Sequence, residues 1–272
     1  MAMAHRERSI CAPLNEGLFD PCARSRGQWL ISFNPQERPK IRLFCFPYAG
    51  GDANIFRDWT VAMPDGIEVI GVQYPGRGCN QELPPISNCD EMVSRLQVMM
   101  APLLGIDFAF FGHSNGALIS FEVARSLLAE PRGRMRHHFL SAKSAPHLSN
   151  SMRKICRLDD DEFIRAIREM GGTPPEVLDD ARLMQRLLPR LRADFAIGER
   201  YVFRPGAGLA CDVSVLRGEH DDSVDGELVK RWSELTTGRV CQYLIDGDHF
   251  FLSSHKLQVV ALVREALLEY AL

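Results

Sequence analysis

Ser114 lies at the centre of a short sequence that could build a nucleophile. The segment Gly112-His-Ser-Asn-Gly116 follows an apolar run that ends at Phe111, and apolar residues at helical spacing begin at Leu118. A strand, Gly-x-Ser-x-Gly and a helix in this order predict a nucleophile elbow, a sharp turn that exposes the serine hydroxyl. A Cβ at either glycine would collide where the backbones of strand and helix come close. The segment therefore predicts acyl transfer through a serine nucleophile.

A serine hydroxyl needs a base within hydrogen-bond reach, and the base needs an acid that holds its tautomer. In doubly wound hydrolases the acid and then the histidine follow the serine, each on a loop at the carboxyl end of a strand. The chain has eight histidines, and His249 follows the last expected strand in the required order, so we predict that it is the base. His255 also comes after that strand, but like His220 it is expected on a polar loop or at a helix start. For the acid, the order of the chain leaves Asp221 and Asp222 as alternatives. Glu219 and Asp225 also remain open.

The carbonyl oxygen gains negative charge during acyl transfer, and two backbone amides usually stabilise it. The amide of Asn115 stands at the start of the expected helix and is one candidate. The second donor should follow the first strand, within Tyr48-Ala49-Gly50. We expect the ring of His113, inside the elbow, to point away from the nucleophile.

The elements that must position these residues alternate between apolar strands and helices. The strands are expected at residues 41–46, 68–72, up to 111, 138–142, 212–216 and 239–245. Asn88 or Asp90 is expected to cap a helix before the elbow strand. This alternation predicts the α/β class, with a mostly parallel, doubly wound sheet covered on both faces.

The alternation stops between about residues 148 and 205, where consecutive helices are expected. Such a block inserted over one edge of a sheet is either a substrate lid or an ordinary helical subdomain. Residues 1–39 show no clear period, so we expect a partly ordered lead-in segment whose Trp29-Leu30-Ile31 lies against the domain. Residues 40–272 are expected to form one domain that includes the helical block.

Composition excludes several classes of function. The 32 Lys and Arg against 35 Asp and Glu give a net charge of -3, so nothing in the charge favours a nucleic-acid partner. The eight cysteines lack the paired spacing of a zinc site. No apolar run reaches membrane-spanning length, and none has the place of a signal peptide. We expect a cytoplasmic, reduced protein without a metal.

Short motifs occur in a fixed order from about residue 40 to the C-terminus. They are Phe46-Pro-Tyr-Ala-Gly-Gly51, Tyr74-Pro-Gly-Arg77, Gly112-His-Ser-Asn-Gly-Ala117, Ala145-Pro-His147, Leu158-Asp-Asp-Asp-Glu-Phe163, Gly171-Gly-Thr-Pro-Pro175, Leu191-Arg-Ala-Asp-Phe195 and Gly247-Asp-His-Phe250. Together they resemble the type II thioesterases, stand-alone α/β-hydrolases that accompany nonribosomal peptide and polyketide synthases. The resemblance implies an α/β-hydrolase fold with a helical lid at about 148–205 over the acyl chamber.

The resemblance also implies roles for single residues. Ser114 would be the nucleophile and His249 the base. Asp221 would be the acid, because the family's Gly-x-x-Asp motif falls on Gly218 to Asp221. Asp222 stands where the family usually has proline.

The family's oxyanion amides fall on Ala49 and Asn115. Asn115 replaces the commoner methionine, a change that leaves the amide but makes the side chain more polar. The family's function would be hydrolysis of acyl thioesters on the phosphopantetheine arm of acyl or peptidyl carrier proteins, which edits mis-primed or stalled synthases. The enzyme would be a monomer with no cofactor of its own. The alternatives are a general carboxylesterase or lipase-like hydrolase, and a non-catalytic binding partner.

Overall fold

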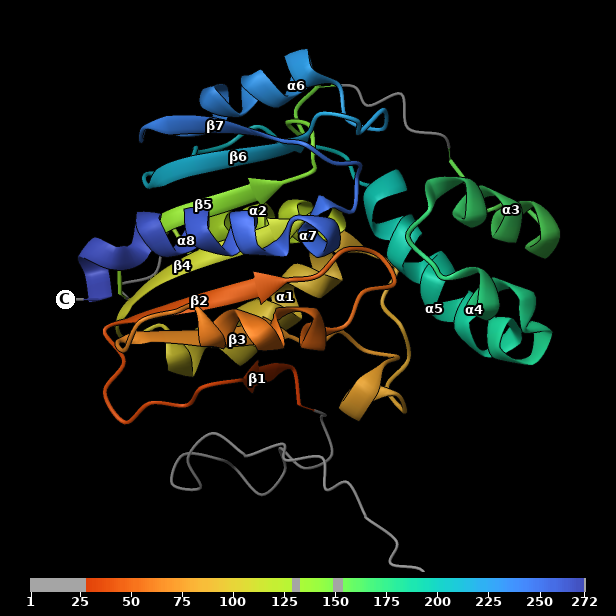
Figure 1. The fold of residues 1–272 in the computed structure, drawn as a ribbon, viewed down its shortest axis with the longest axis horizontal. Coiled ribbons are helices and arrows are strands. Elements are labelled where there is room, and N and C mark those ends of the chain that lie inside the picture. Colours follow the sequence, from red (N-terminus) through yellow and green to blue (C-terminus); the bar gives the residue numbers. More distant parts are fainter. Residues whose placement is uncertain (1–27, 129–132, 149–153, 272) are drawn as a thin grey trace, which may run out of the picture.

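The computed structural model of the protein describes residues 28–128, 133–148 and 154–271. Its centre is a seven-stranded sheet with the strand order β1-β3-β2-β4-β5-β6-β7 (Figure 1). The strands are β1 Leu30–Ser32, β2 Ile41–Phe46, β3 Ile67–Val72, β4 Asp107–His113, β5 Met135–Ser141, β6 Asp212–Gly218 and β7 Val240–Ile245. Among the strands of the described residues, only β1 and β3 pair antiparallel, and every other neighbouring pair is parallel. The predicted α/β class and mostly parallel sheet are therefore confirmed.

The central strands are apolar on both faces, which is why they sit inside a parallel sheet. Every residue of β3 is buried, as are all but one in β2. In the register of β2 and β4, Phe46 lies opposite Gly112, so the end of β2 stands beside the elbow. Ile245 pairs with Gly218 at the same edge. The carboxyl ends of the parallel strands thus bring together loops that are far apart in sequence.

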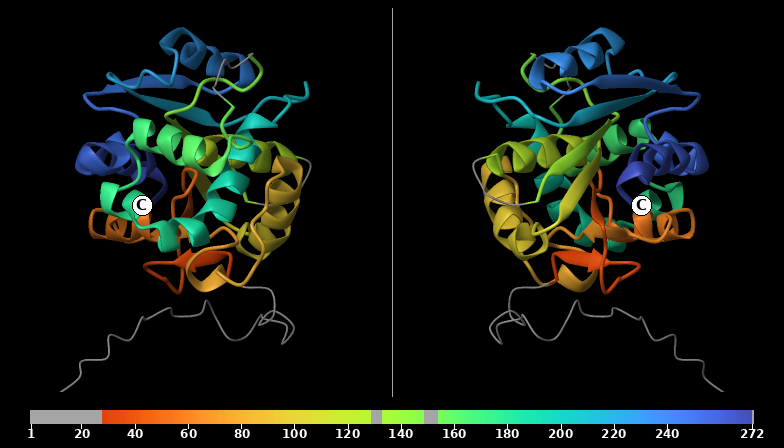
Figure 2. Two further views of the ribbon diagram at one scale, coloured as in Figure 1. Left: turned by 90° about the vertical axis from the view of Figure 1, so that its right-hand side faces the viewer. Right: turned by 90° about the vertical axis from the view of Figure 1, so that its left-hand side faces the viewer.

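Helices cover both faces of the sheet (Figures 1 and 2). Helices α1 (Cys89–Met100) and α2 (Asn115–Ser126) pack on one face. The 3-10 helix η2 (Ala53–Val61) and helix α8 (Lys256–Ala271) pack on the other. The remaining short helices are η3 Gly78–Asn80, η4 Ala101–Leu103, α6 Gly226–Lys230, η5 Arg231–Leu235 and α7 Phe251–Ser254. Of the two candidates for the cap of α1, Asn88 is the residue that accepts a hydrogen bond, from the Glu91 amide.

The helical block consists of α3 (Asp160–Met170), α4 (Pro175–Asp179) and α5 (Ala181–Glu199). These helices share a hydrophobic cluster that is separate from the two clusters beside the sheet. They lie beyond the carboxyl ends of the strands, on the right in Figure 1. Residues 149–153 of the predicted block lie outside the described residues. The helical block therefore lies at the same end of the sheet as the elbow, which follows the carboxyl end of β4.

The described part of the predicted lead-in contributes a strand to the sheet. Leu30 of β1 pairs with Val72 of β3 at the edge of the sheet. Trp29, Leu30 and Ile31 are buried there. Residues 1–27 of the lead-in lie outside the described residues. No helix in the described ranges is long and apolar enough to cross a membrane.

Candidate active site

The backbone turns sharply at Ser114, between β4 and α2. Its φ of 55° and ψ of -118° are unusual for a residue with a side chain. A Cβ at Gly112 would lie 2.4 Å from the Gly116 carbonyl oxygen, and one at Gly116 would lie 2.1 Å from the Phe46 carbonyl oxygen. The glycines therefore let the helix start directly against two strands. Such backbone strain is of the order of 1–3 kcal/mol and is typical of functional sites.

Ser114, His249 and Asp221 are joined by hydrogen bonds. The Ser114 Oγ lies 3.0 Å from the His249 Nε2, and the His249 Nδ1 lies 2.7 Å from the Asp221 Oδ2. The serine comes from the elbow, the aspartate from the loop after β6, and the histidine from the loop after β7. The structure thus brings together three residues that are up to 135 positions apart.

The arrangement defines the direction of proton transfer. An ionised carboxylate only accepts hydrogen bonds, so the His249 Nδ1 carries the proton and its Nε2 accepts from the Ser114 hydroxyl. Burial of the Asp221 carboxyl raises its pKa, but the hydrogen bond and charge of His249 outweigh this, and the pKa of Asp221 is lowered. Asp221 is therefore charged at neutral pH and can stabilise a histidine cation.

The other candidates for the acid lie elsewhere. Asp222 and Glu219 are exposed, and Asp225 accepts a hydrogen bond from the Glu227 amide at the start of α6. Asp221 is 4% exposed. It also accepts hydrogen bonds from the amide and the hydroxyl of Ser223, at 3.0 and 2.6 Å.

Two backbone amides were predicted to bind the oxyanion, those of Ala49 and Asn115. Among the described residues, the amides of Ala49 and Asn115 have no hydrogen-bond acceptor. Asn115 is the first residue of α2, where the helix presents positive partial charge. The two segments are in backbone contact, because the carbonyl oxygens of Phe46 and Pro47 surround Gly116. The loop that carries the Ala49 amide therefore lies next to the start of α2.

His113 contacts the backbone of the histidine loop. Its Nε2 lies 2.9 Å from the His249 carbonyl oxygen, and its Nδ1 lies 2.8 Å from the Ser141 Oγ. A carbonyl only accepts, so Nε2 carries the proton and Nδ1 accepts from the serine hydroxyl. Burial is the largest cause that lowers the pKa of His113 to about 3. The ring is thus neutral and holds the loop of His249.

Comparison with known proteins identifies the family. The family model described as "Thioesterase domain" matches residues 41–267. The chain belongs to the thioesterase family. It is 37% identical to the gramicidin S biosynthesis protein GrsT of Aneurinibacillus migulanus, over 86% of this chain and 91% of that protein. It is 34% identical to the thioesterase PikA5 of Streptomyces venezuelae, over 84% of this chain and 81% of that protein.

The fold comparison agrees with the sequence comparison. The structure of the type II thioesterase BorB from the borrelidin biosynthetic cluster superimposes with a TM-score of 0.81 and 30% identity, covering 88% of this chain and 97% of that one. This thioesterase therefore has the α/β-hydrolase fold that the motifs implied. It is a serine hydrolase that acts on thioesters.

The turn between α3 and α4 in the thioesterase's inserted block contacts the loop of His249. The Phe250 ring packs on Gly172, where an added Cβ would lie 2.0 Å from the ring. The same ring stands edge-on to Tyr48 and to His249, at centroid distances of 5.3 and 5.2 Å. The Phe250 side chain thus contacts the loop after β2, the ring of His249 and the turn between α3 and α4.

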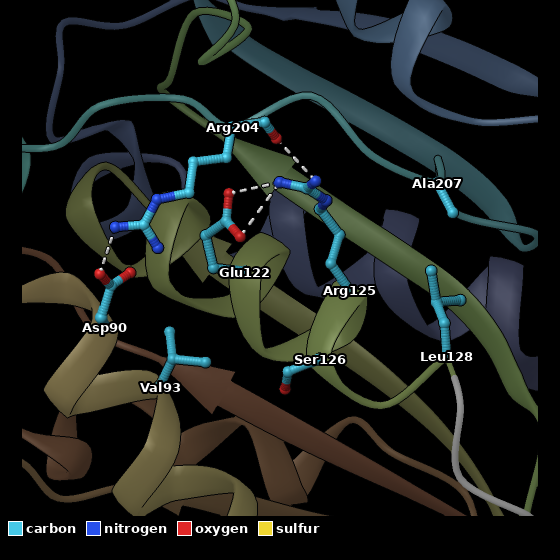
Figure 3. Close-up of a pocket in the computed structure, with 8 residues that line it drawn as sticks. All are labelled: Asp90, Val93, Glu122, Arg125, Ser126, Leu128, Arg204 and Ala207. Carbon is cyan, nitrogen blue, oxygen red and sulfur yellow. Dashed lines mark hydrogen bonds and ion pairs between the residues drawn. The ribbon is translucent and has the colours of Figure 1, made fainter.

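A separate surface cavity of about 350 Å³ lies between α1, α2 and the segment after α5 (Figure 3). Its charged groups pair with one another, Asp90 with Arg204 at 2.7 Å and Glu122 with Arg125 at 2.9 Å. The α2 residues that line it are two turns or more from Ser114. The cavity is not part of the thioester site.

Sequence reasoning gave no role to Ser223, Arg77 or Asp194. Arg77 and Asp194 stand in motifs that carry the family resemblance, and Asp194 is a charged residue on an otherwise apolar helix face. The signal that could have singled out Asp194 is its spacing, because it falls on the same helix face as the apolar residues Leu191 and Ile197, where a charged residue is rare.

Proposed function

We propose that this thioesterase releases acyl groups from the phosphopantetheine arm of acyl or peptidyl carrier proteins, as an editing enzyme of a nonribosomal peptide or polyketide synthase. The observation that carries the proposal is the Ser114–His249–Asp221 chain of hydrogen bonds in a protein of this family. Support for the partner comes from relatives described by their biosynthetic pathways, among them GrsT and BorB.

In the proposed reaction Ser114 attacks the thioester carbonyl while His249 takes the hydroxyl proton. The amides of Ala49 and Asn115 stabilise the oxyanion. The carbon–sulfur bond breaks, and the thiol leaves with the proton from His249. Water then gives a proton to His249 and attacks the acyl-serine ester. The tetrahedral intermediate formed by this attack breaks its bond to the Ser114 oxygen, which takes back the proton from His249, and the carboxylic acid is released. One water is consumed for each thiol and acid formed.

The helical block is proposed to act as the lid of this reaction. Its apolar cluster would line a chamber for the acyl chain, with α3 to α5 above the carboxyl ends of the strands. We propose further that the enzyme works as a monomer in the cytoplasm, where the carrier proteins supply the phosphopantetheine. It would need no cofactor or metal of its own.

The test is a panel of carrier proteins loaded with different acyl groups, with release followed by mass detection of the carrier. We expect release by the unmodified enzyme, loss of release for Ser114→Ala, and much slower hydrolysis of matched oxygen esters. Equal rates on oxygen esters would indicate a general carboxylesterase instead. Unchanged release by Ser114→Ala would contradict the assignment of the nucleophile.

A further inference from the structure

Asp194, on the lid helix α5, contacts both segments that carry the two oxyanion amides. Its side-chain Oδ2 accepts a hydrogen bond from the Gly50 amide at 2.7 Å. Its backbone carbonyl oxygen accepts one from the Asn115 Nδ2 at 2.6 Å. The first bond joins residues that are 144 positions apart in the sequence, and the second joins residues that are 79 positions apart. A single lid residue therefore connects the loop after β2 with the start of α2.

The carboxylate of Asp194 is held in place by Arg77. The Arg77 Nη2 lies 2.6 Å from Oδ1 and its Nη1 lies 2.8 Å from Oδ2, so the pair is bidentate. Arg77 is 2% exposed and Asp194 is 4% exposed. Such a planar two-bond arrangement fixes orientation as well as charge. Arg77 also donates to the Gly51 carbonyl oxygen at 2.8 Å, which adds a second attachment to the same loop.

The bond to Gly50 acts on the geometry of Ala49. The Gly50 amide belongs to the peptide plane between Ala49 and Gly50, so the bond from Asp194 restrains the peptide unit that follows the Ala49 amide. Gly50 has a φ of +81°, and an added Cβ would lie 2.8 Å from a Leu191 methyl of α5. The residue after Ala49 is thus held against the lid helix by both a hydrogen bond and a close contact.

The contact with Asn115 explains its polar side chain. Gly198, one turn beyond Asp194 on α5, lies so close that an added Cβ would be 2.5 Å from the Asn115 Oδ1. The side chain of Asn115 is buried against α5. The start of α2 and the second half of α5 are therefore one packed unit.

We propose that Asp194 is a positioning residue that aligns both oxyanion amides, so that the oxyanion site is complete only while α5 is seated on the elbow. The proposal rests on the proposed roles of Ala49 and Asn115. The lid helix then has two functions, because it covers the acyl chamber and also sets the groups that stabilise the transition state.

The test is the rate at which a fluorophosphonate modifies the Ser114 hydroxyl, with fluoride as the leaving group, followed by intact-protein mass. The phosphonyl oxygen requires the same amides as the oxyanion of a thioester. Two double variants remove the buried charges without leaving one unpaired. Arg77→Gln with Asp194→Asn keeps an acceptor for the Gly50 amide, whereas Arg77→Met with Asp194→Leu removes it.

We expect the Arg77→Met with Asp194→Leu enzyme to have a limiting rate constant about 10- to 100-fold lower. Removing an oxyanion donor outright costs about 100- to 1,000-fold, and a misplaced donor should cost less. The fluorophosphonate concentration that gives half of the maximal rate should change little. The Arg77→Gln with Asp194→Asn enzyme should keep most of the limiting rate constant. Equal rate constants for the two pairs would overturn the proposal.

Glu68→Gln is the matched control. Glu68 is 1% exposed and pairs with Arg42 at 2.9 Å at the amino end of the sheet, far from Ser114. Glu68→Gln should lower stability and leave the labelling rate unchanged. If it slowed labelling as much as the Arg77→Met with Asp194→Leu pair does, general destabilisation would explain the effect. Labelling does not depend on the acyl carrier, so a normally labelled enzyme that releases nothing from carriers would contradict only the proposed function.

Discussion

The imidazole of His113 donates a hydrogen bond from Nε2 to the backbone carbonyl oxygen of His249, at 2.9 Å. His113 directly precedes Ser114, so the elbow thereby holds the loop that carries His249. The two rings stand 5.6 Å apart between centroids. The elbow and the histidine loop are thus joined twice, through Ser114 and through His113.

The change His113→Phe should lower kcat about tenfold and destabilise the fold by about 1–3 kcal/mol, because the partly buried His249 carbonyl loses its donor. His138→Phe is the matched control, since His138 is also fully buried but bonds to the Ser120 hydroxyl instead. It should lower stability without lowering kcat. Thioester hydrolysis and urea unfolding of both variants check this, and equal kcat values would contradict a positioning role for His113.

Asp221→Asn should lower kcat by roughly 10³- to 10⁴-fold, because an amide no longer holds the productive tautomer of His249 or stabilises its cation. Asp222→Asn is the control next to it in the chain. Its side chain is exposed, so thioester hydrolysis should be nearly unchanged. A larger loss for Asp222→Asn would show that the acid has been assigned to the wrong residue.

Order along the chain could not choose between these two aspartates, because both follow the same strand. The choice depends on how the loop turns after β6, which puts Asp221 inside and Asp222 in solvent. The strands themselves were predictable. The run at 41–46 was predicted with the bounds that β2 has, since apolar residues end there at a proline and glycines.

Contacts across long stretches of chain were not predictable. Arg77 and Asp194 are 117 positions apart, and nothing local marks them as partners. The strand β1 has three residues and forms only by pairing with the edge strand β3 of the parallel sheet, so its own sequence does not predict it. The last strand was predicted from its apolar residues, yet it lies at the edge of the sheet, where Cys241 and Leu244 are exposed.

Three buried histidines should make stability depend on pH. Burial is the largest cause that lowers the pKa of His113 and His138 to about 3 and that of His137 to about 4, from 6.5. Below pH 6.5 the unfolded chain binds more protons than the folded one, so the free energy of unfolding falls as the pH drops from 6.5 towards 4. Three such groups give a slope of about 4 kcal/mol for each pH unit well below 6.5.

Urea unfolding at pH 7, 6 and 5 measures this slope. The variant His138→Phe carries one buried histidine fewer, so its slope should be smaller by about one third. An unfolding free energy that stays constant between pH 7 and 5 would contradict the prediction.

Gly116→Ala should prevent the elbow from forming. The new Cβ would meet the Phe46 carbonyl oxygen at 2.1 Å, and backbone cannot move aside as a side chain tip can. We expect a loss of more than about 3 kcal/mol or an insoluble protein. Gly105→Ala is the control, because an added Cβ there has no neighbour within 4 Å. A Gly116→Ala enzyme with normal stability, measured by thermal unfolding, would contradict the close approach at the elbow.

In a double-mutant cycle, Gly198→Ala should have opposite effects on stability in the unmodified and the Asn115→Ala enzymes. Gly198→Ala alone should destabilise the enzyme, because its Cβ would meet the Asn115 Oδ1 at 2.5 Å and break the bond from Nδ2 to the Asp194 carbonyl. In an Asn115→Ala background the obstacle is gone. Alanine then gains about 1 kcal/mol over glycine inside a helix, so the same change should be stabilising. Chemical denaturation of the four proteins gives the interaction energy between the two positions. Equal effects of Gly198→Ala in both backgrounds would show that the Asn115 side chain does not pack on α5.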